Sequence, residues 1–193
     1  TRFTEIGSGI SALANLETLA LNNNQVQTLP DSFSRLAKLK ALSFWNNQLT
    51  TLPADLSGLT GVTSVGLGSN NLEELPEGVF TLPNVESLSA TNNNLREVDS
   101  RIGDLTKLKT IDFDGNQIQT LPDSINNLTA LTALKIKDTQ LTTLPADLSG
   151  LVGVKAVDLG SNKLEELPEG LFTLPNVESL SATDNSIREV GSG

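Results

Sequence analysis

The sequence lacks cysteine, histidine, methionine and tyrosine, and it has a single tryptophan among its 193 residues. Without cysteine it can form neither disulfides nor thiolate metal sites. Without histidine or cysteine, the Ser–His and Cys–His pairs of nucleophilic catalysis cannot be built. No glycine-rich phosphate motif opens a helix either. We therefore expect a protein that is not an enzyme and has neither a cofactor nor a bound metal.

Basic residues are also scarce, since 13 lysines and arginines face 23 acidic residues and leave a net charge of −10. Nucleic acids and anionic membranes select for basic surfaces, so we expect neither as a partner. No apolar run approaches membrane-spanning length, and the first residues do not resemble a signal peptide. The absence of cysteine fits a reducing compartment and favours the cytoplasm, but the sequence does not name the compartment.

A period of 23 residues runs through the chain. An apolar residue opens each repeat at Leu16, Leu39, Val62, Val85, Leu108, Leu131, Val154 and Val177. The ninth position is asparagine at Asn24, Asn47, Asn70, Asn93, Asn116, Asn162 and Asn185, with Thr139 as the exception. A fixed period of this size indicates a solenoid, in which each unit buries its apolar side against its neighbours. We expect one domain over residues 1–193, comprising a half repeat (1–15), seven full repeats (16–176) and a partial repeat (177–193).

Each repeat follows the pattern LxxLxLxxNxLxxLPxxLxxLxx. The opening LxxLxL alternates apolar and polar residues and predicts a short strand with one buried face. Strands stacked at the same phase give a parallel sheet, and the asparagine can satisfy backbone groups where the chain turns. The LPxxLxxL half predicts one or two helical turns on the outer side, as in residues 30–33 and 122–125. Strands inside and bulkier turns outside predict a curved array with the sheet on its concave face.

These residues resemble the leucine-rich repeat family, and the resemblance covers the whole chain. The 23-residue length with LPxxLxxL is similar to the class in Ras-suppressor, Scribble-like and Roco proteins, and to some bacterial effector repeats. The resemblance implies an α/β fold, a right-handed horseshoe solenoid with a parallel sheet on the concave face and short helical turns on the convex face. It further implies a non-catalytic scaffold that binds a protein partner through the concave face.

A second period of 92 residues, or four repeats, overlies the first. Residues 48–98 and 140–190 differ at nine of 51 positions, and six of these lie on or beside the predicted strand face. Either the copies drifted, or a designer chose the surface residues freely, or the inner surfaces diverged for different contacts; we favour different contacts. The termini also match in phase, because residues 1–9 and 185–193 both end in Gly-Ser-Gly. Without capping units, such ends indicate a fragment or a site for homo-oligomer formation.

The first candidate site surrounds Trp45 at the seventh position of its repeat. This position should be exposed at the end of the strand, and Asn22 and Gly68 flank it in the neighbouring repeats. An exposed tryptophan among small polar groups such as Ser43 and Asn46 is typical of a binding hot spot. The alternative is a ring that lies flat on its neighbours as surface cover.

A second candidate site is charged and lies further along the sheet. The fifth and seventh positions there alternate in sign, and adjacent strands lie about 4.8 Å apart, so each lysine should face a carboxylate. These residues form either a self-neutralising surface ladder or a patch that recognises a charged partner: Asp112, Asp114, Lys135, Lys137 and Asp158. A calcium or magnesium site using Asp112, Asp114 and Asp138 is disfavoured by the two interleaved lysines.

Two further interpretations stay open at this point. The chain could be a structural or self-associating array, including a designed repeat protein. It could also be the recognition arm of a larger signalling protein or enzyme. The sequence does not name the partner.

Overall fold

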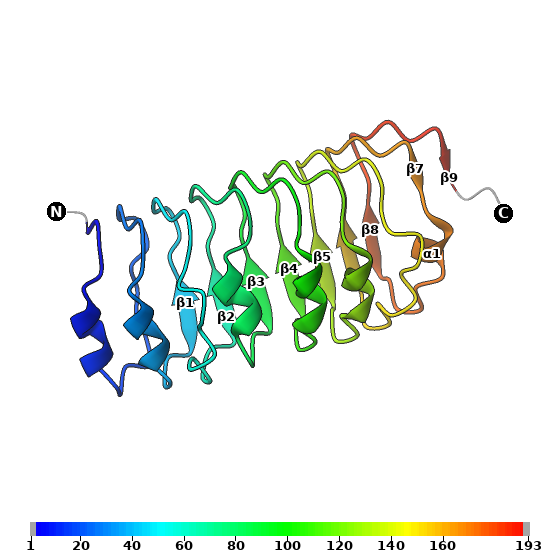
Figure 1. The fold of residues 1–193 in the computed structure, drawn as a ribbon. Coiled ribbons are helices and arrows are strands. Elements are labelled where there is room, and N and C mark those ends of the chain that lie inside the picture. The colour runs from blue at the N-terminus through cyan, green and yellow to red at the C-terminus, as the bar shows by residue number, and fades with distance from the viewer. Residues whose placement is uncertain (1–2, 191–193) are drawn as a thin grey trace.

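The computed structural model describes residues 3–190, so the outermost residues of the two matching termini lie outside the described part. The chain winds into a solenoid whose ends lie at opposite ends of the stack (Figure 1). One parallel sheet lines one side, with strand order β1-β2-β3-β4-β5-β6-β8. Its strands are β1 (Ala41–Ser43), β2 (Ser64–Gly66), β3 (Ser87–Ser89), β4 (Thr110–Asp112), β5 (Ala133–Lys135), β6 (Ala156–Asp158) and β8 (Ser179–Ser181).

The register of the sheet reproduces the 23-residue period. Leu42 pairs with Val65, and Val65 pairs with Leu88, so equivalent residues lie side by side throughout. From β1 to β4 and in β6 the central residue of the strand is buried and its two neighbours are half-buried, as the alternating pattern predicts. A bridge from Ala20 to Ser43 extends the pairing to the preceding repeat. The predicted parallel sheet is confirmed.

The outer side carries short helical turns, nearly all of the 3₁₀ type. They are η1 (Ser8–Ala12), η2 (Asp31–Arg35), η3 (Glu77–Thr81), η4 (Ser100–Asp104), η5 (Asp123–Asn127) and the α-helix α1 (Glu169–Phe172). A two-stranded sheet of β7 (Glu166–Leu167) and β9 (Glu189–Val190) lies near the carboxyl end. None of the helices within residues 3–190 is long and apolar enough to cross a bilayer.

Two repeats lack the helical turn that their sequence predicts. After Pro53 and after Pro145 the chain forms bends and turns instead. In the first, the Asp55 carboxylate accepts the N–H of Ser57 at 2.9 Å, and Asp147 accepts that of Ser149 in the second. Such local hydrogen bonds compete with helical ones. Hydrogen bonding to the side chain and backbone of Ser57 lowers the pKa of Asp55, and bonding to the backbone and side chain of Ser149 lowers that of Asp147. The prediction of a helical turn was wrong at these two places.

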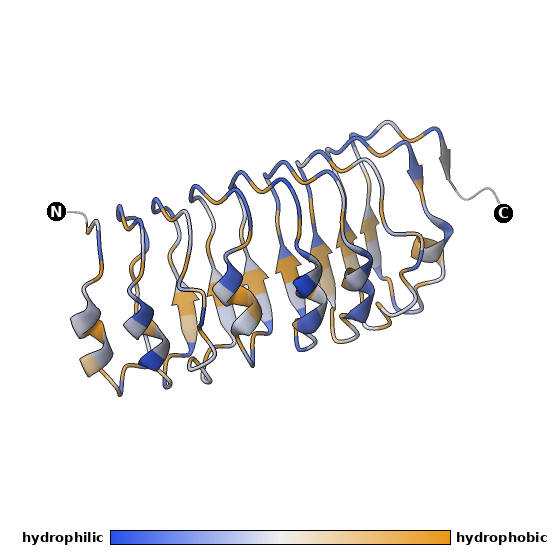
Figure 2. Cartoon of the chain, in the orientation of Figure 1, coloured by the Kyte–Doolittle hydropathy of each residue, from blue (hydrophilic) through white to orange (hydrophobic). Residues whose placement is uncertain are grey.

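The core consists of the repeated apolar positions stacked between the sheet and the outer turns. Hydrophobic residues recur along the strands, while hydrophilic residues gather in the loops that follow them (Figure 2). Phe33 and Phe44 are fully buried and their ring centroids lie 6.0 Å apart. Because each apolar side chain packs against neighbouring repeats, the core is continuous along the stack.

The asparagines at the ninth position form a buried hydrogen-bond ladder. Asn93 is representative: its Oδ1 accepts the N–H of Leu72, and its Nδ2 donates to the carbonyl oxygens of Leu67, Ala90 and Thr91. Each asparagine thus joins two repeats through backbone groups outside the sheet ladder. The predicted role of the asparagines is confirmed.

The eighth position of the repeat adopts a left-handed conformation. Its φ angle is positive in every repeat, from 52° at Asn92 to 70° at Gly115. Asparagine, aspartate and glycine tolerate this region best, and they occupy most of these positions. Ser69 and Ser161 hold the same conformation without that advantage. The turn lets the chain leave the sheet and places the seventh position at the strand's end.

Candidate functional site

The candidate site is the solvent-facing side of the seven-stranded sheet, which we call the concave face. Its amino-terminal half is lined by small side chains, because Ser43, Ser64, Gly66, Ser87 and Ser89 occupy the third and fifth positions of successive repeats. In the carboxyl-terminal half, aspartates and lysines replace them. The two halves therefore offer different chemistry on one continuous surface.

Trp45 lies in the amino-terminal half of this face, among the small side chains, with 40% of its surface exposed. Its indole ring lies against the next repeat. A Cβ built on Gly68 would lie 2.6 Å from Trp45 Cε2, and one built on Gly66 would lie 3.4 Å from Trp45 Cδ1. Only a glycine at residue 68 lets the ring approach so closely. The ring thus covers its neighbours with one face and meets solvent with the rest, and its role in binding stays a prediction.

Three polar residues predicted beside Trp45 are engaged with each other or with the backbone. Asn22 Oδ1 accepts the N–H of Trp45 at 2.8 Å and the hydroxyl of Ser43 at 3.0 Å. Asn46 Nδ2 donates to Asn23 Oδ1 at 2.9 Å. These bonds fix the main chain beneath the indole. Asn22 therefore fixes the backbone of Trp45, and the contact of Asn22, Ser43 and Asn46 with a partner stays a prediction.

The charged residues at the fifth and seventh positions of the repeats, which we call the charged rows, form ion pairs only in part. Lys135 Nζ lies 3.8 Å from Asp112 Oδ2, across neighbouring strands, as predicted. Within residues 3–190, however, the Lys137 ammonium forms no ion pair. Instead the backbone N–H of Lys137 donates to Asp114 Oδ1 at 2.7 Å. The prediction that each lysine faces a carboxylate was wrong for Lys137, because the carboxylate turns toward the backbone.

The carboxylates of Asp158 and Asp114 also accept hydrogen bonds from backbone N–H groups at the ends of the strands. Asp158 Oδ1 accepts the N–H of Gly160 at 3.1 Å. Asp114 is half-buried, and desolvation raises the pKa of its carboxyl, helped by the nearby charges of Asp112 and Asp158. The hydrogen bond from the Lys137 N–H lowers that pKa and offsets part of the effect. This part of the face thus disfavours additional negative charge.

Acidic residues do not gather into a metal site in the described part of the chain. Among residues 3–190, no group of three histidine, cysteine, aspartate or glutamate side chains could hold a metal ion. Asp112, Asp114 and Asp138 therefore do not form such a group.

Family membership follows from the repeat sequence itself. The leucine rich repeat family profile matches residues 14–72, 60–118 and 83–141, which together cover more than half of the chain. The chain is a leucine-rich-repeat protein. The comparison with curated proteins found no matching sequence.

Solved structures of other leucine-rich-repeat proteins share the fold. A Leptospira interrogans leucine-rich-repeat protein is 26% identical with a TM-score of 0.75, covering 99% of this chain and 54% of its own. The ectodomain of the receptor kinase GASSHO1/SCHENGEN3 from Arabidopsis thaliana, solved with CASPARIAN STRIP INTEGRITY FACTOR 2, is 25% identical with a TM-score of 0.81, covering 95% and 23%. PEPR1, solved with AtPEP1, is 28% identical with a TM-score of 0.81, covering 97% and 27%.

The chain spans about half the length of the Leptospira protein and about a quarter of the GASSHO1/SCHENGEN3 ectodomain and of PEPR1. The matching family and these structures indicate an interaction domain and point to no catalytic family. The horseshoe fold predicted from the leucine-rich-repeat pattern is confirmed.

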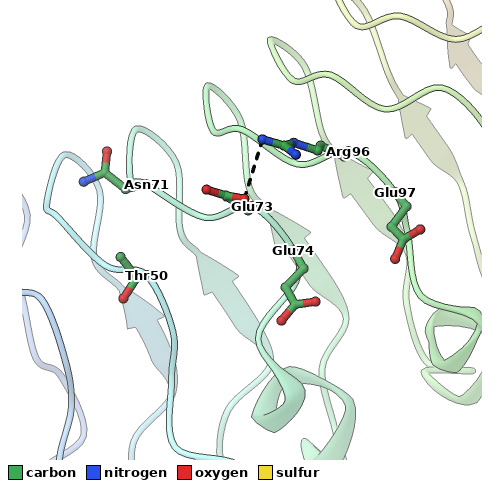
Figure 3. A pocket seen from close by; sticks show the side chains of 6 residues that line it. All are labelled: Thr50, Asn71, Glu73, Glu74, Arg96 and Glu97. Carbon is green, nitrogen blue, oxygen red and sulfur yellow. Dashed lines mark ion pairs between the residues drawn. The ribbon is translucent and has the colours of Figure 1, made fainter.

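Sequence reasoning did not predict a hollow on the flank of the leucine-rich-repeat solenoid, outside the sheet. It has a volume of about 570 Å³ and is lined by Thr50, Asn71, Glu73, Glu74, Arg96 and Glu97. Figure 3 shows these side chains on the loops that follow the strands. Arg96 and Glu73 pair at 3.6 Å, but both are well exposed, so this ion pair contributes little. The hollow holds no buried polar group that would fix a ligand.

Sequence reasoning also missed what lies beneath the Trp45 ring. Gly68 and Thr91 follow Trp45 at the seventh position of the next two repeats, and both are buried. The Thr91 hydroxyl is buried and has no hydrogen-bond partner. No sequence signal separates this threonine from the exposed Thr183, which occupies the same position four repeats later.

Proposed function

We propose that this chain is a non-catalytic protein-binding module that recognises an extended polypeptide on its concave face, with Trp45 as the anchor. The observation that carries the proposal is the Trp45 indole, braced over Gly66 and Gly68 and 40% exposed among small side chains. A preoriented aromatic ring gives large contact area at little cost in conformational entropy. GASSHO1/SCHENGEN3 was solved with CASPARIAN STRIP INTEGRITY FACTOR 2 and PEPR1 with AtPEP1, and these complexes support a polypeptide partner.

The charged rows give the proposed face its direction. Moving along the stack from Trp45, a bound segment passes small polar groups and then reaches Asp112 and Asp114. Three strand spacings of about 4.8 Å separate the Trp45 repeat from the Asp114 repeat, a span of about four extended residues. A suitable partner thus carries an apolar side chain over Trp45 and a basic side chain about four residues away, which the net charge of −10 also favours.

A random peptide library selected on the intact chain tests the proposal, because Trp45 is the only tryptophan and its fluorescence reports contact directly. Selected peptides should shift the Trp45 emission, and Trp45→Ala should weaken them at least tenfold, as expected for a hot spot. The matched control is Val152→Ala, an exposed apolar residue away from the sheet. Equal binding to the parent and to Trp45→Ala would remove Trp45 as the anchor.

A second candidate function is self-association, and one observation favours it. Phe3, Leu13 and Leu180 lie in the first and last described repeats and are 61%, 51% and 39% exposed. Further repeats of a longer chain would cover the same side chains. Light scattering over a concentration series decides this point: a monomer at every concentration removes self-association as a function.

A further inference from the structure

In four of the eight repeats, the backbone N–H at the seventh position has a side-chain acceptor. Asn22 accepts from Trp45, Asp114 from Lys137 and Asp158 from Gly160, at 2.8, 2.7 and 3.1 Å. Asp112 accepts more weakly from the seventh-position N–H of its own repeat, at 3.4 Å. These acceptors replace the strand neighbour that the N–H would have in a longer sheet.

The other four repeats have no such acceptor within residues 3–190. Asn22 and Thr183 are exposed there, whereas Gly68 and Thr91, in consecutive repeats, are buried. Within residues 3–190, the N–H groups of Gly68 and Thr91 have no hydrogen-bond acceptor. Both residues are buried, and the residues that would supply the acceptor are Trp45, Gly66, Gly68 and Ser89, none of which does so. Buried N–H groups without partners are rare, and each costs about 1–3 kcal/mol.

The Thr91 side chain adds a third unsatisfied group at the same point. Thr91 is 8% exposed, and its Oγ1 has no hydrogen-bond partner. A Cβ built on Gly68 would lie 2.7 Å from Thr91 Oγ1 and 2.6 Å from Trp45 Cε2. The hydroxyl and the indole thus face each other across Gly68. The Thr91 hydroxyl and the two residues whose N–H groups lack acceptors thus lie side by side next to the indole ring.

We propose that this point, which we call the Gly68 subsite, binds a side-chain carboxamide of the partner, from an asparagine or a glutamine. The inference rests on the proposed function, since it deepens the recognition of a polypeptide on the concave face. The carboxamide oxygen accepts from the N–H of Gly68, in the place that corresponds to Asn22 Oδ1, which accepts from Trp45 in the preceding repeat. Its amide group donates to Thr91 Oγ1, which has no other hydrogen-bond partner.

Charge selects a carboxamide over a carboxylate at this point. Three donors would also suit a carboxylate, but Asp112 and Asp114 lie in the repeat next to Thr91. Burial and neighbouring charges already raise the pKa of Asp114, so a second carboxylate nearby is disfavoured. A neutral carboxamide supplies the acceptor oxygen without a negative charge. Its NH₂ group adds two donors, which can bond to the oxygens of an acidic surface.

Access to the subsite depends on Trp45. The indole rests on Gly68, and within residues 3–190 no hydrogen bond holds its Nε1. Packing alone keeps the ring in place, so it can move aside at the cost of its contacts with Gly66 and Gly68. The displaced ring then packs against the entering side chain.

The second copy of the 92-residue unit shows the subsite in a closed form. Gly160 corresponds to Gly68, and its N–H is satisfied by Asp158, which corresponds to Gly66. Lys137 stands where Trp45 stands in the first copy. Gly66→Asp should therefore close the subsite with a side chain that the same scaffold already accommodates. A Cβ at residue 66 would lie 3.4 Å from Trp45 Cδ1, an ordinary contact.

Nuclear magnetic resonance of the intact, isotope-labelled chain tests the subsite with acetamide as the probe and acetate as its charged counterpart. Acetamide should shift the amide resonances of Gly68 and Thr91 saturably, together with the Trp45 emission, and acetate should bind more weakly. Thr91→Val should weaken acetamide about tenfold, the value of one hydrogen bond. Gly66→Asp should abolish the shifts. The control Thr183→Val should change nothing.

Three results would overturn the inference. They are an absence of shifts up to the solubility limit of acetamide, a preference for acetate, and unchanged shifts in Gly66→Asp. A fourth contrary result is a tightly held water at this point that acetamide does not displace, because the site would then hold only a structural water. If library peptides depend on Trp45 while acetamide fails to bind, the subsite is wrong and the concave-face function stands. If acetamide binds and no peptide depends on Trp45, the subsite stands and the concave-face function with Trp45 as anchor is wrong.

Discussion

Replacing Asn93 with alanine should destabilise the solenoid by about 1–3 kcal/mol, which is the cost of one buried unsatisfied donor. Asn93 Oδ1 is the only acceptor of the Leu72 N–H in residues 3–190. Its Nδ2 donates to three carbonyl oxygens, but each keeps another donor. Leu67 O retains Asn70, Ala90 O retains Asn116, and Thr91 O retains the N–H of Ser69. The loss is therefore concentrated on one N–H group.

Thr139 occupies the ninth position, where the other repeats have asparagine, and it allows an intermediate loss of stability to be predicted. Thr139 Oγ1 donates to Asn162 Oδ1 at 2.5 Å, while the buried Ile118 N–H finds no acceptor within the described residues. Asn93→Thr should thus lose the Leu72 bond but gain one to Asn116, and fall between the parent and Asn93→Ala. Thr139→Asn should restore the acceptor for Ile118 and stabilise the chain by about 1 kcal/mol.

Urea unfolding followed by circular dichroism measures these differences, with hydrogen exchange at Leu72 as the local readout. The matched control is Asn94→Ala, an exposed neighbour whose side chain makes no hydrogen bond in residues 3–190. It should stay within about 0.5 kcal/mol of the parent. The reasoning is refuted if Asn93→Ala matches this control, if Thr139→Asn destabilises the chain, or if Leu72 exchange is unchanged in Asn93→Ala.

Three further predictions concern the concave face and its turns. Gly68→Ala should displace the Trp45 indole and red-shift its emission, since the new Cβ would lie 2.6 Å from the ring; an unchanged spectrum contradicts this. Ser69→Gly should stabilise the chain by about 1 kcal/mol in urea unfolding, because glycine adopts the φ of 53° without strain. Asp114 binds its proton more tightly folded than unfolded, so its contribution to stability falls as pH rises above its ordinary pKa of 3.8. Asp114→Asn keeps the acceptor for Lys137 and should gain stability over the parent between acidic and neutral pH; equal urea midpoints at every pH would exclude that explanation.

The sheet was predictable from the sequence because the repeat period sets its register directly. Leu42, Val65 and Leu88 occupy one position of the repeat, and they stack as neighbours. The asparagine ladder was predictable for the same reason. The missing helical turns near Asp55 and Asp147 were not, because a local carboxylate–backbone bond competes with a helix without changing the apolar pattern.

The candidate site was predictable only at the level of residue position. The repeat placed Trp45 on the exposed end of a strand, next to Gly68. It did not reveal that Asp114 turns its carboxylate to the Lys137 backbone, nor that the N–H groups of Gly68 and Thr91 lack acceptors. Both facts depend on where backbone N–H groups point, which apolar periodicity does not encode.

The duplication of four repeats has a consequence for valency. The first copy carries the proposed Gly68 subsite beneath Trp45, and the second has its closed counterpart at Gly160, four strands further along the same sheet. Lys137→Trp together with Asp158→Gly would install a second opening about 19 Å away, at about 4.8 Å for each strand. One polypeptide carrying two suitably spaced carboxamides would then engage both openings, and the second contact would form at a high effective concentration. A single chain would become a bivalent receptor whose spacing is fixed by its own repeat.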